Sequence, residues 1–219
     1  MARENLTRRG RARRDALVAH AVDVVAKQGI AGTKVTHIAR AAGVRSTLLY
    51  WYFDDLYDLV RFAISDATRR LNAHLVAAVS GLGDPLEQLY VAVREATAFG
   101  ATDPEMRIIS TADAEHAFGG AYRDALERST AALVAETTRL LDAGRRRGSV
   151  RRDLPLEDLA QCIRSLVHYN VTAYHRGTLH RDAARFAVTT ANIALRGVAA
   201  NPAAVDELAS RLDARGYAS

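Results

Sequence analysis

The sequence has a single cysteine, Cys162, among 219 residues. One thiol excludes an intrachain disulfide, and it excludes a metal site built on several thiolates. Leu159, Ile163 and Leu166 surround Cys162 at helical spacing, so we expect it to be a small buried apolar residue. A redox-sensing role for this thiol is the less favoured alternative.

Long hydrophobic runs are also missing. No uncharged apolar stretch approaches the roughly 18 residues that a membrane-spanning helix needs. The amino terminus is basic, but no apolar signal core follows it. Since 49% of the residues are hydrophobic, the chain still has enough apolar side chains for a sizeable core. We therefore expect a soluble, cytoplasmic protein with no membrane partner.

Recognisable catalytic and metal-binding motifs are absent. The seven histidines are dispersed, with no HxxxH or HExxH pair, and the sequence has neither GxSxG nor GxxxxGK[ST]. We accordingly expect no catalytic residues, no metal and no cofactor. A small all-α enzyme needs a compact set of acid, base or metal groups, and it is the least favoured function.

The segment that organises the chain runs from Lys34 to Phe53, KVTHIARAAGVRSTLLYWYF. Its first half has apolar residues at helical spacing, and Gly43 then provides a residue that adopts positive φ without steric cost. A second short helix follows over residues 48–53. Two helices joined at a tight corner containing glycine predict a helix-turn-helix, whose second helix enters the DNA major groove. The apolar residues of the first helix are Val35, Ile38, Ala39 and Ala42.

Polar and aromatic side chains of this segment suit DNA recognition. Residues 45–47 open the second helix, where recognition helices meet base edges, and three aromatics follow whose N–H and hydroxyl groups can reach phosphates or bases. Three consecutive aromatics cannot all face one core, so at least one must be exposed. For Thr36, a plain surface position is the alternative. The residues expected at DNA are Lys34, Thr36, Arg45, Ser46, Thr47, Tyr50, Trp51 and Tyr52.

Basic charge is concentrated on the same part of the chain. Residues 1–53 contain ten Lys or Arg and three acidic residues, whereas residues 54–219 contain twenty and twenty-two. The amino-terminal part is therefore strongly positive and the remainder slightly negative. This asymmetry is typical of phosphate binding. A basic arm over residues 1–10 either lies along DNA or serves only as a soluble tail.

The segment resembles the DNA-binding domain of the tetracycline-repressor (TetR) family of bacterial regulators. The resemblance rests on Ile38-Ala39, Ala42-Gly43-Val44, Leu49-Tyr50-Trp51-Tyr52-Phe53 and the acidic helix start at Asp54-Asp55. Two departures stand out. Leu48 occupies a position where the family often has threonine, and Leu56 one where it usually has a phosphate-binding lysine. We therefore expect fewer phosphate contacts near Leu56.

The rest of the sequence predicts helices that are separated by Gly and Pro. Helical spacing predicts helices over residues 11–28, 56–75, 86–100, 122–144, 156–174, 182–197 and 202–212, and Thr33 is the expected N-cap of the helix after the first. No strand-like alternation or internal repeat stands out. The fold class is thus all-α. We expect an amino-terminal three-helix DNA-binding domain over residues 1–55 and a larger helical domain over residues 56–219.

The larger domain offers candidates for a small-molecule site between helices. An all-helical domain can hold a ligand between its helices, but aromatic residues and Met at helical spacing are more often ordinary core residues. Arg145, Arg146, Arg147, Arg151 and Arg152 form a basic cluster that either binds nucleic acid or suits a helix carboxyl end, and we favour the helix end. The ligand candidates are Tyr90, Phe99, Met106, His116, Tyr122 and His168.

The resemblance implies a one-component transcriptional regulator, usually a repressor. It implies a homodimer that pairs through the last two long helices and binds a palindromic operator on double-stranded DNA. A small-molecule effector would bind the larger domain and release the operator. A ligand-independent DNA-binding protein remains the alternative, because nothing in residues 85–200 demands a cavity.

Overall fold

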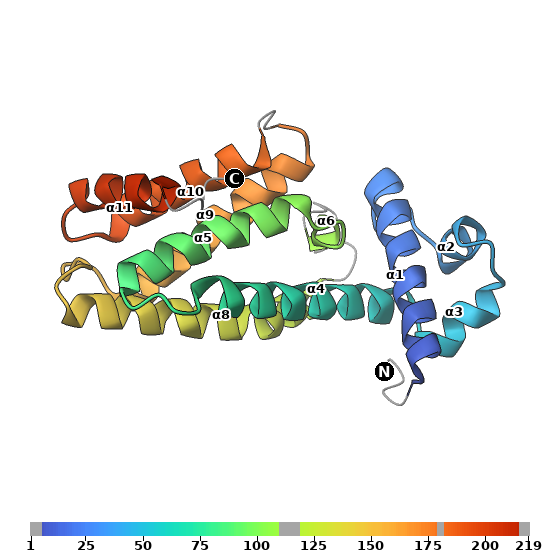
Figure 1. Ribbon diagram of the computed structural model, residues 1–219. Coiled ribbons are helices and arrows are strands. Elements are labelled where there is room, and N and C mark those ends of the chain that lie inside the picture. Colours follow the sequence, from blue (N-terminus) through green and yellow to red (C-terminus); the bar gives the residue numbers. More distant parts are fainter. Residues whose placement is uncertain (1–5, 110–118, 179–181, 215–219) are drawn as a thin grey trace. The chain divides into compact units, whose positions relative to one another are not determined.

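A computed structural model describes residues 6–109, 119–178 and 182–214 (Figure 1). These residues form helices and connecting turns without a strand, and the one β-bridge among them joins Val150 to Ala199. The all-α prediction is confirmed. The helices are α1 (Arg8–Gln28), α2 (Val35–Ala41), α3 (Ser46–Tyr52), α4 (Leu56–Val79), α5 (Pro85–Thr102), α6 (Met106–Ile109), α8 (Gly120–Arg146), α9 (Leu156–His175), α10 (Ala183–Val198) and α11 (Ala203–Ala214).

The chain divides into two compact units. The first comprises Met1–Arg69 with Asp103–Ser129, and the second comprises Arg70–Thr102 with Thr130–Ser219. The division falls inside α4 and inside α8, so it does not coincide with the expected boundary at residue 55. The boundary at residue 55 marks the end of the helix-turn-helix motif in the sequence, and it stays a prediction.

The first unit is built around α1. Thr7 caps this helix, because its hydroxyl accepts a hydrogen bond from the Gly10 N–H at 3.1 Å. The helix therefore begins three residues before the predicted start, within the segment expected to be an arm. The spacing predicts an apolar stripe of Leu17, Val18, Ala21, Val24 and Val25. All of them are buried except the half-buried Val24, and they pack against side chains from α2, α3 and the first turns of α4. The core residues of α1 are Leu17, Val18, Ala21, Val22 and Val25.

The corner between α2 and α3 has the conformation that its sequence predicts. Gly43 adopts φ +64°. Its N–H donates to the Arg40 carbonyl at 3.2 Å, and the Val44 N–H donates to the Ala39 carbonyl at 2.9 Å. This pair of bonds closes a Schellman motif and satisfies the last carbonyls of α2. The chain then turns directly into α3.

The start of α4 is fixed by acidic side chains, as predicted. The Asp55 carboxylate accepts the Asp58 N–H at 2.7 Å, and Asp58 accepts the Asp54 N–H at 3.3 Å. Arg61 donates to the other Asp58 oxygen at 2.5 Å. Leu56 is half-buried and packs against the core of the first unit. It therefore serves packing at the position where the family usually has a lysine.

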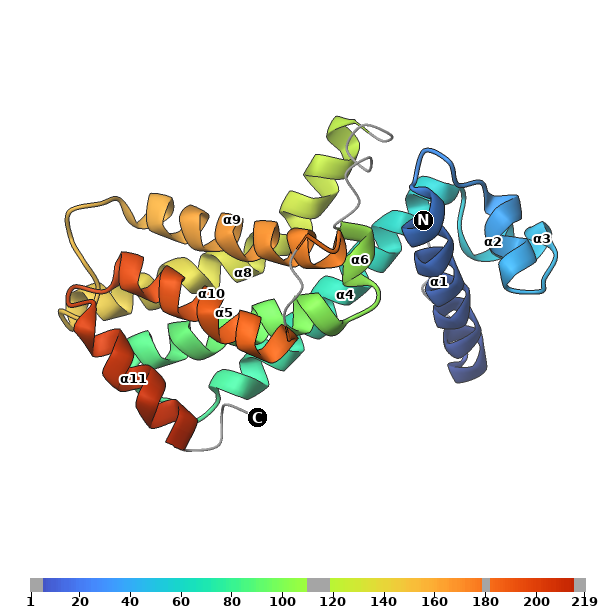
Figure 2. The same cartoon turned by 90° about the horizontal axis from the view of Figure 1, so that it is seen from above.

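In the second unit, α10 lies along α5 and α9 packs against both (Figures 1 and 2). Gly100 allows α5 to pack closely on α9, because a Cβ there would lie 2.7 Å from Cγ2 of Val171. His175 also binds the Gly100 carbonyl through Nε2 at 2.7 Å. This histidine joins α9 to α5.

Two local expectations are wrong. Cys162 is exposed, because it precedes the buried Ile163 by one residue and therefore lies about 100° around α9. Thr33 is not the N-cap of α2, since that position belongs to Lys34. The Thr33 hydroxyl instead donates to the Gly29 carbonyl at 2.6 Å. In both cases the neighbouring residue has the expected role: Lys34 is the N-cap, and Ile163 is buried. Apolar spacing alone does not distinguish two adjacent residues.

The arginine cluster at the end of α8 and in the turn before α9 binds backbone carbonyls. Arg145 donates from Nη2 to the Leu154 carbonyl at 2.5 Å, and Arg147 donates from Nη1 to the Gly83 carbonyl at 2.7 Å. Arg152 donates from Nη2 to the Arg145 carbonyl at 3.1 Å. These guanidinium groups satisfy backbone acceptors at helix ends and turns. Their bonding supports the helix-end interpretation over a second nucleic-acid surface.

Candidate nucleic-acid interface

Helix α3 presents a polar and aromatic face to solvent. Tyr50 is 56% exposed and Trp51 is 43% exposed, although both are large and partly apolar. Arg45 and Thr47 are exposed as well, and Ser46 is half-buried. Arg45 is the residue that precedes the helix, and its backbone is extended. Arg45, Ser46 and Thr47 lie at the amino-terminal end of α3, where a recognition helix meets base edges, and Tyr50 and Trp51 extend the exposed surface toward its carboxyl end.

Tyr52 lies on the opposite side of α3 and is 4% exposed. It packs in the core of the first unit with Leu49 and Phe53, and its ring meets that of Trp51 edge-on at 4.6 Å. The sequence placed Tyr52 among the DNA-binding residues. Its burial removes it from the surface that we assign to DNA, because a side chain enclosed by the core does not reach a phosphate or base.

Helix α2 brings a second group of polar residues. Lys34 and Thr36 are exposed at its start. His37 is partly exposed beside them, and its Nδ1 is bound to Gln28 at the end of α1. It is not among the residues expected at DNA. The signal for it in the sequence was weak, because a lone histidine in a short helix has many possible roles.

One arginine of the basic amino-terminal segment, Arg14, makes contacts within the first unit. The Arg14 guanidinium lies over the Phe62 ring, 4.1 Å from its centroid, and donates from Nε and Nη2 to the Asp15 carboxylate at 3.2 and 3.0 Å. A cation placed over an aromatic face is attracted by the ring quadrupole. This contact joins α1 to α4, and it shows that part of the amino-terminal charge stabilises the domain.

The described ligand candidates are divided between the two units. Tyr90 and Phe99 belong to α5 in the second unit, whereas Met106 packs against the core of the first unit. His116 and the side chain of Tyr122 lie outside the described residues. His168 is exposed on α9. The structure therefore defines no single ligand site from these six residues.

Two of these candidates have perturbed titration. Burial raises the pKa of Tyr90, which is 1% exposed, and the nearby charge of Asp213 acts in the same direction. The Tyr90 hydroxyl has no hydrogen-bond partner among the described residues. Partial desolvation also lowers the pKa of His168, with a smaller contribution from Arg164. Both side chains are uncharged at neutral pH.

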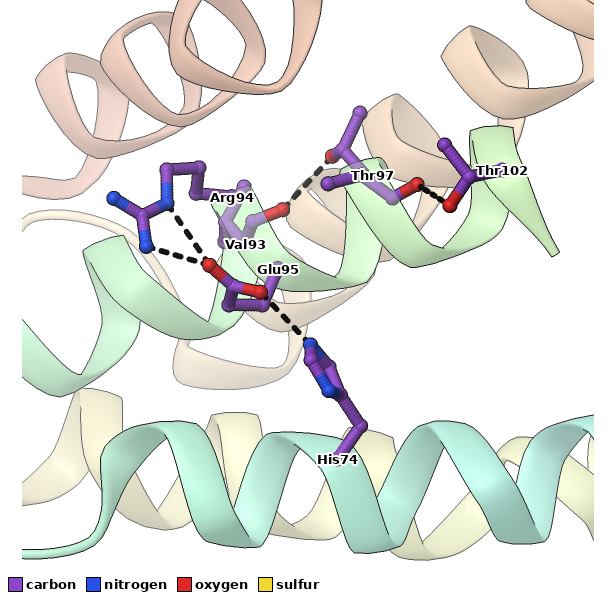
Figure 3. A network of polar contacts seen from close by, with 7 residues as sticks. His74, Val93, Arg94, Glu95, Thr97 and Thr102 are labelled. Atoms are coloured by element: carbon purple, nitrogen blue, oxygen red, sulfur yellow. Dashed lines mark hydrogen bonds and ion pairs between the residues drawn. The ribbon is translucent and has the colours of Figure 1, made fainter. Parts of the chain in front are cut away.

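A polar network crosses from α4 to α5 in the second unit (Figure 3). One Glu95 oxygen accepts hydrogen bonds from Nε and Nη2 of Arg94 at 3.1 and 2.5 Å, and the other lies 2.8 Å from Nε2 of His74. Burial opposes ionisation of Glu95, but the bonds from Arg94 and His74 outweigh it and hold its pKa below the ordinary value of 4.5. The His74 ring also lies 5.5 Å from that of Phe99.

Metal-binding and membrane-spanning features are not found in the described parts of the chain. Within residues 6–109, 119–178 and 182–214, no three His, Cys, Asp or Glu side chains are grouped so that they could bind a metal ion. Over the same residues, no helix combines the length and the apolar character needed to cross a bilayer.

The fold and the exposed face of α3 define the class: an all-α protein with an amino-terminal helix-turn-helix domain. Residues 17–61 match the family described as bacterial regulatory proteins, tetR family. This match covers the amino-terminal helix-turn-helix segment and agrees with the resemblance seen in its sequence. Since the members are described as regulatory proteins, the match favours a regulator over the enzyme alternative.

Solved structures of regulators share the fold at low sequence identity. FadR from Bacillus halodurans, a fatty acid degradation regulator, is 20% identical with a TM-score of 0.75, over 83% of this chain and 94% of that chain. FadR from Bacillus subtilis in complex with stearoyl-CoA is 16% identical with a TM-score of 0.73, over 83% and 97%. AibR in complex with isovaleryl coenzyme A and operator DNA is 17% identical with a TM-score of 0.69, over 83% and 97%. No curated protein matches the sequence.

Proposed function

We propose that this protein is a cytoplasmic transcriptional repressor that binds a palindromic operator as a homodimer and releases it when a small molecule binds. The observation that carries the proposal is the exposed face of α3, with Arg45, Thr47, Tyr50 and Trp51 directed away from the core. Large aromatic side chains at such exposure need a binding role, and the excess of basic charge over residues 1–53 favours DNA as the partner.

Pairing through α9 and α10, the last two long helices, is part of the proposal. Tyr169 on α9 is 70% exposed, and Ile193 on α10 is 57% exposed. Burial of such side chains against a second copy would remove apolar surface from water. A dimer also provides two recognition helices, which a palindromic operator requires.

For the effector, we propose an acyl-coenzyme A thioester as the first class to test. The Bacillus subtilis FadR and AibR structures contain stearoyl-CoA and isovaleryl coenzyme A, and both share the fold of this chain. An effector that binds the operator-free state more tightly shifts the population away from DNA, typically by a coupling of about 1–3 kcal/mol.

The test starts with selection of bound fragments from genomic DNA, followed by anisotropy titration of a labelled duplex. The expected result is dimeric binding to a palindrome with an affinity that falls steeply as salt is added, because counterions are released from phosphates. Binding that is independent of sequence, or a protein that stays monomeric when bound, would contradict the proposal. Trp51 is the only tryptophan, so its emission provides a second, label-free readout on α3.

A ligand-independent DNA-binding protein is the second candidate. A thermal-shift screen with acyl-CoA thioesters of different chain length and with hydrophobic metabolites separates the two, when it is run with and without the selected duplex. A compound that raises the melting temperature and weakens duplex binding supports the repressor. Absence of any such compound favours the second candidate.

A further inference from the structure

Hydrogen-bond donors from Gln28 and Lys34 fix the tautomer of His37 at the junction of α1 and α2. The backbone N–H of Lys34 points to Nδ1 at 3.4 Å, and Nε2 of the Gln28 amide lies 2.8 Å from the same nitrogen. A backbone N–H can only donate, so Nδ1 must accept. The neutral imidazole therefore carries its proton on Nε2.

The orientation of the Gln28 amide is fixed by further contacts. Its Nε2 also lies 3.2 Å from the Gly32 carbonyl oxygen and 3.3 Å from the Thr33 hydroxyl, so its two N–H groups are shared among three acceptors. A carbonyl only accepts, so the amide nitrogen and not the amide oxygen must face this group of atoms. The same nitrogen is thus presented to His37 as a donor, in agreement with the Lys34 N–H.

The outer nitrogen of His37 remains available. Nε2 makes no hydrogen bond among the described residues, and the side chain is partly exposed between the exposed Lys34 and Arg40. A neutral Nε2–H offers one donor and no acceptor. This is suited to a phosphate oxygen, whereas base readout generally uses paired donors and acceptors. The first helix of a helix-turn-helix crosses the DNA backbone, and α2 is that helix.

We propose that His37 is a DNA-contacting residue that donates from Nε2 to a backbone phosphate oxygen, and that Gln28 is the positioning residue that sets its tautomer. The inference rests on the DNA binding proposed above. Because the donor is neutral, His37 adds a directed hydrogen bond without displacing a counterion. It therefore differs from Lys34, whose charge contributes to the salt dependence of binding.

Two substitutions separate the inner and outer nitrogens. His37→Asn keeps an acceptor at the place of Nδ1 and removes the outer donor, whereas His37→Gln keeps a donor at the place of Nε2 and removes the inner acceptor. The expected loss of affinity for the selected duplex is about tenfold for His37→Asn, since a hydrogen bond to a charged group is lost. His37→Gln is expected to stay within about threefold of the wild type. His20→Asn, at an exposed position on α1, is the matched control and should bind like the wild type.

Salt dependence and a modified duplex test the chemistry of the contact. His37→Asn should leave the slope of log affinity against log salt unchanged, whereas Lys34→Ala should reduce it by about one per subunit. A scan that replaces one phosphate at a time by neutral methylphosphonate should find a position that weakens the wild type but not His37→Asn. Equal affinity of His37→Asn and the wild type overturns the inference, and so does an equal loss in both His37 variants.

Nitrogen-15 NMR of the histidine side chains tests the tautomer without DNA. The expected spectrum shows His37 protonated on Nε2 and unprotonated on Nδ1 at neutral pH, with the signal assigned by its loss in His37→Asn. A proton on Nδ1 overturns the inference whatever the DNA results. If the wild type binds no duplex while the tautomer is as expected, the proposed function has failed and the hydrogen-bond geometry has not.

Discussion

Nε2 of His74 on α4 lies 2.8 Å from the Glu95 carboxylate on α5, and 21 residues separate the two in sequence. The same carboxylate accepts two bonds from Arg94, whose side chain is 8% exposed. A buried guanidinium needs such an acceptor, because desolvation of a charge is costly without a partner. Glu95 therefore connects a buried cation to the last turns of α4.

Removal of the Glu95 charge should destabilise the second unit. Glu95→Gln is expected to lower the free energy of unfolding by about 2 kcal/mol at pH 7, since hydrogen bonds from charged donors are weakened. Denaturant unfolding measures the difference. Glu136→Gln on α8 is the control: its partner Arg139 is 59% exposed, and such surface pairs contribute about 0–1 kcal/mol. Equal losses in both variants would contradict the role of burial.

The contribution of Glu95 should also depend on pH in one direction. Its pKa is lower in the folded chain than the ordinary value of 4.5, so the stabilisation is fully present above that value. It is lost as the pH falls through the folded pKa. The stability difference between wild type and Glu95→Gln should therefore shrink below pH 4.5, as measured by denaturant unfolding across a pH series. A difference that grows on acidification would contradict the assignment.

Tyr50 and Tyr52 should give opposite phenotypes, although only one residue separates them. Tyr50→Ala removes an exposed side chain and is expected to weaken specific DNA binding by about 1–3 kcal/mol with an unchanged melting temperature. Tyr52→Ala opens the core and should cost about 3–5 kcal/mol of stability. Calorimetry and duplex titration of both variants make the comparison. Unchanged duplex affinity in Tyr50→Ala would count against the assigned face of α3.

Gly43 should tolerate a side chain poorly for conformational reasons alone. Its φ is +64°, and no atom lies within 4 Å of the position that a Cβ would occupy. Gly43→Ala is therefore expected to destabilise the first unit by about 1–2 kcal/mol. Gly83 has equally open surroundings without a positive φ, and Gly83→Ala should be neutral or slightly stabilising. Thermal unfolding of the two variants tests whether φ decides the difference.

Gly100 should be sensitive for a steric reason. A Cβ at this position would lie 2.7 Å from Val171, so Gly100→Ala is expected to force α5 and α9 apart at a cost of about 1–3 kcal/mol. Val171→Ala removes the obstructing methyl groups. The double variant should consequently lose less stability than the sum of the two single variants, which a double-mutant cycle measures. Additive losses would show that the clash is relieved elsewhere.

The helix-turn-helix could be predicted because its signals are local. The spacing of Ile38 and Ala39, the glycine at position 43 and the acidic start at Asp55 each act within a few residues, and the structure confirms each of them. The ligand candidates could not be predicted in this way. Phe99 and Met106 are seven residues apart, yet they belong to different units, because a turn at Asp103-Pro104 separates their helices.

The sequence by itself determined the helices, the helix-turn-helix and the basic amino-terminal segment, since apolar periodicity, glycine and charge are properties of short stretches. Only the tertiary structure decided that Tyr52 is buried while Tyr50 is exposed, that Cys162 is exposed, and that Arg145 at the end of α8 binds a backbone carbonyl. It also brought Gln28 and Lys34 to the same nitrogen of His37. The physical reason is that one residue along a helix turns a side chain by about 100°, so its environment depends on which neighbouring helices pack there.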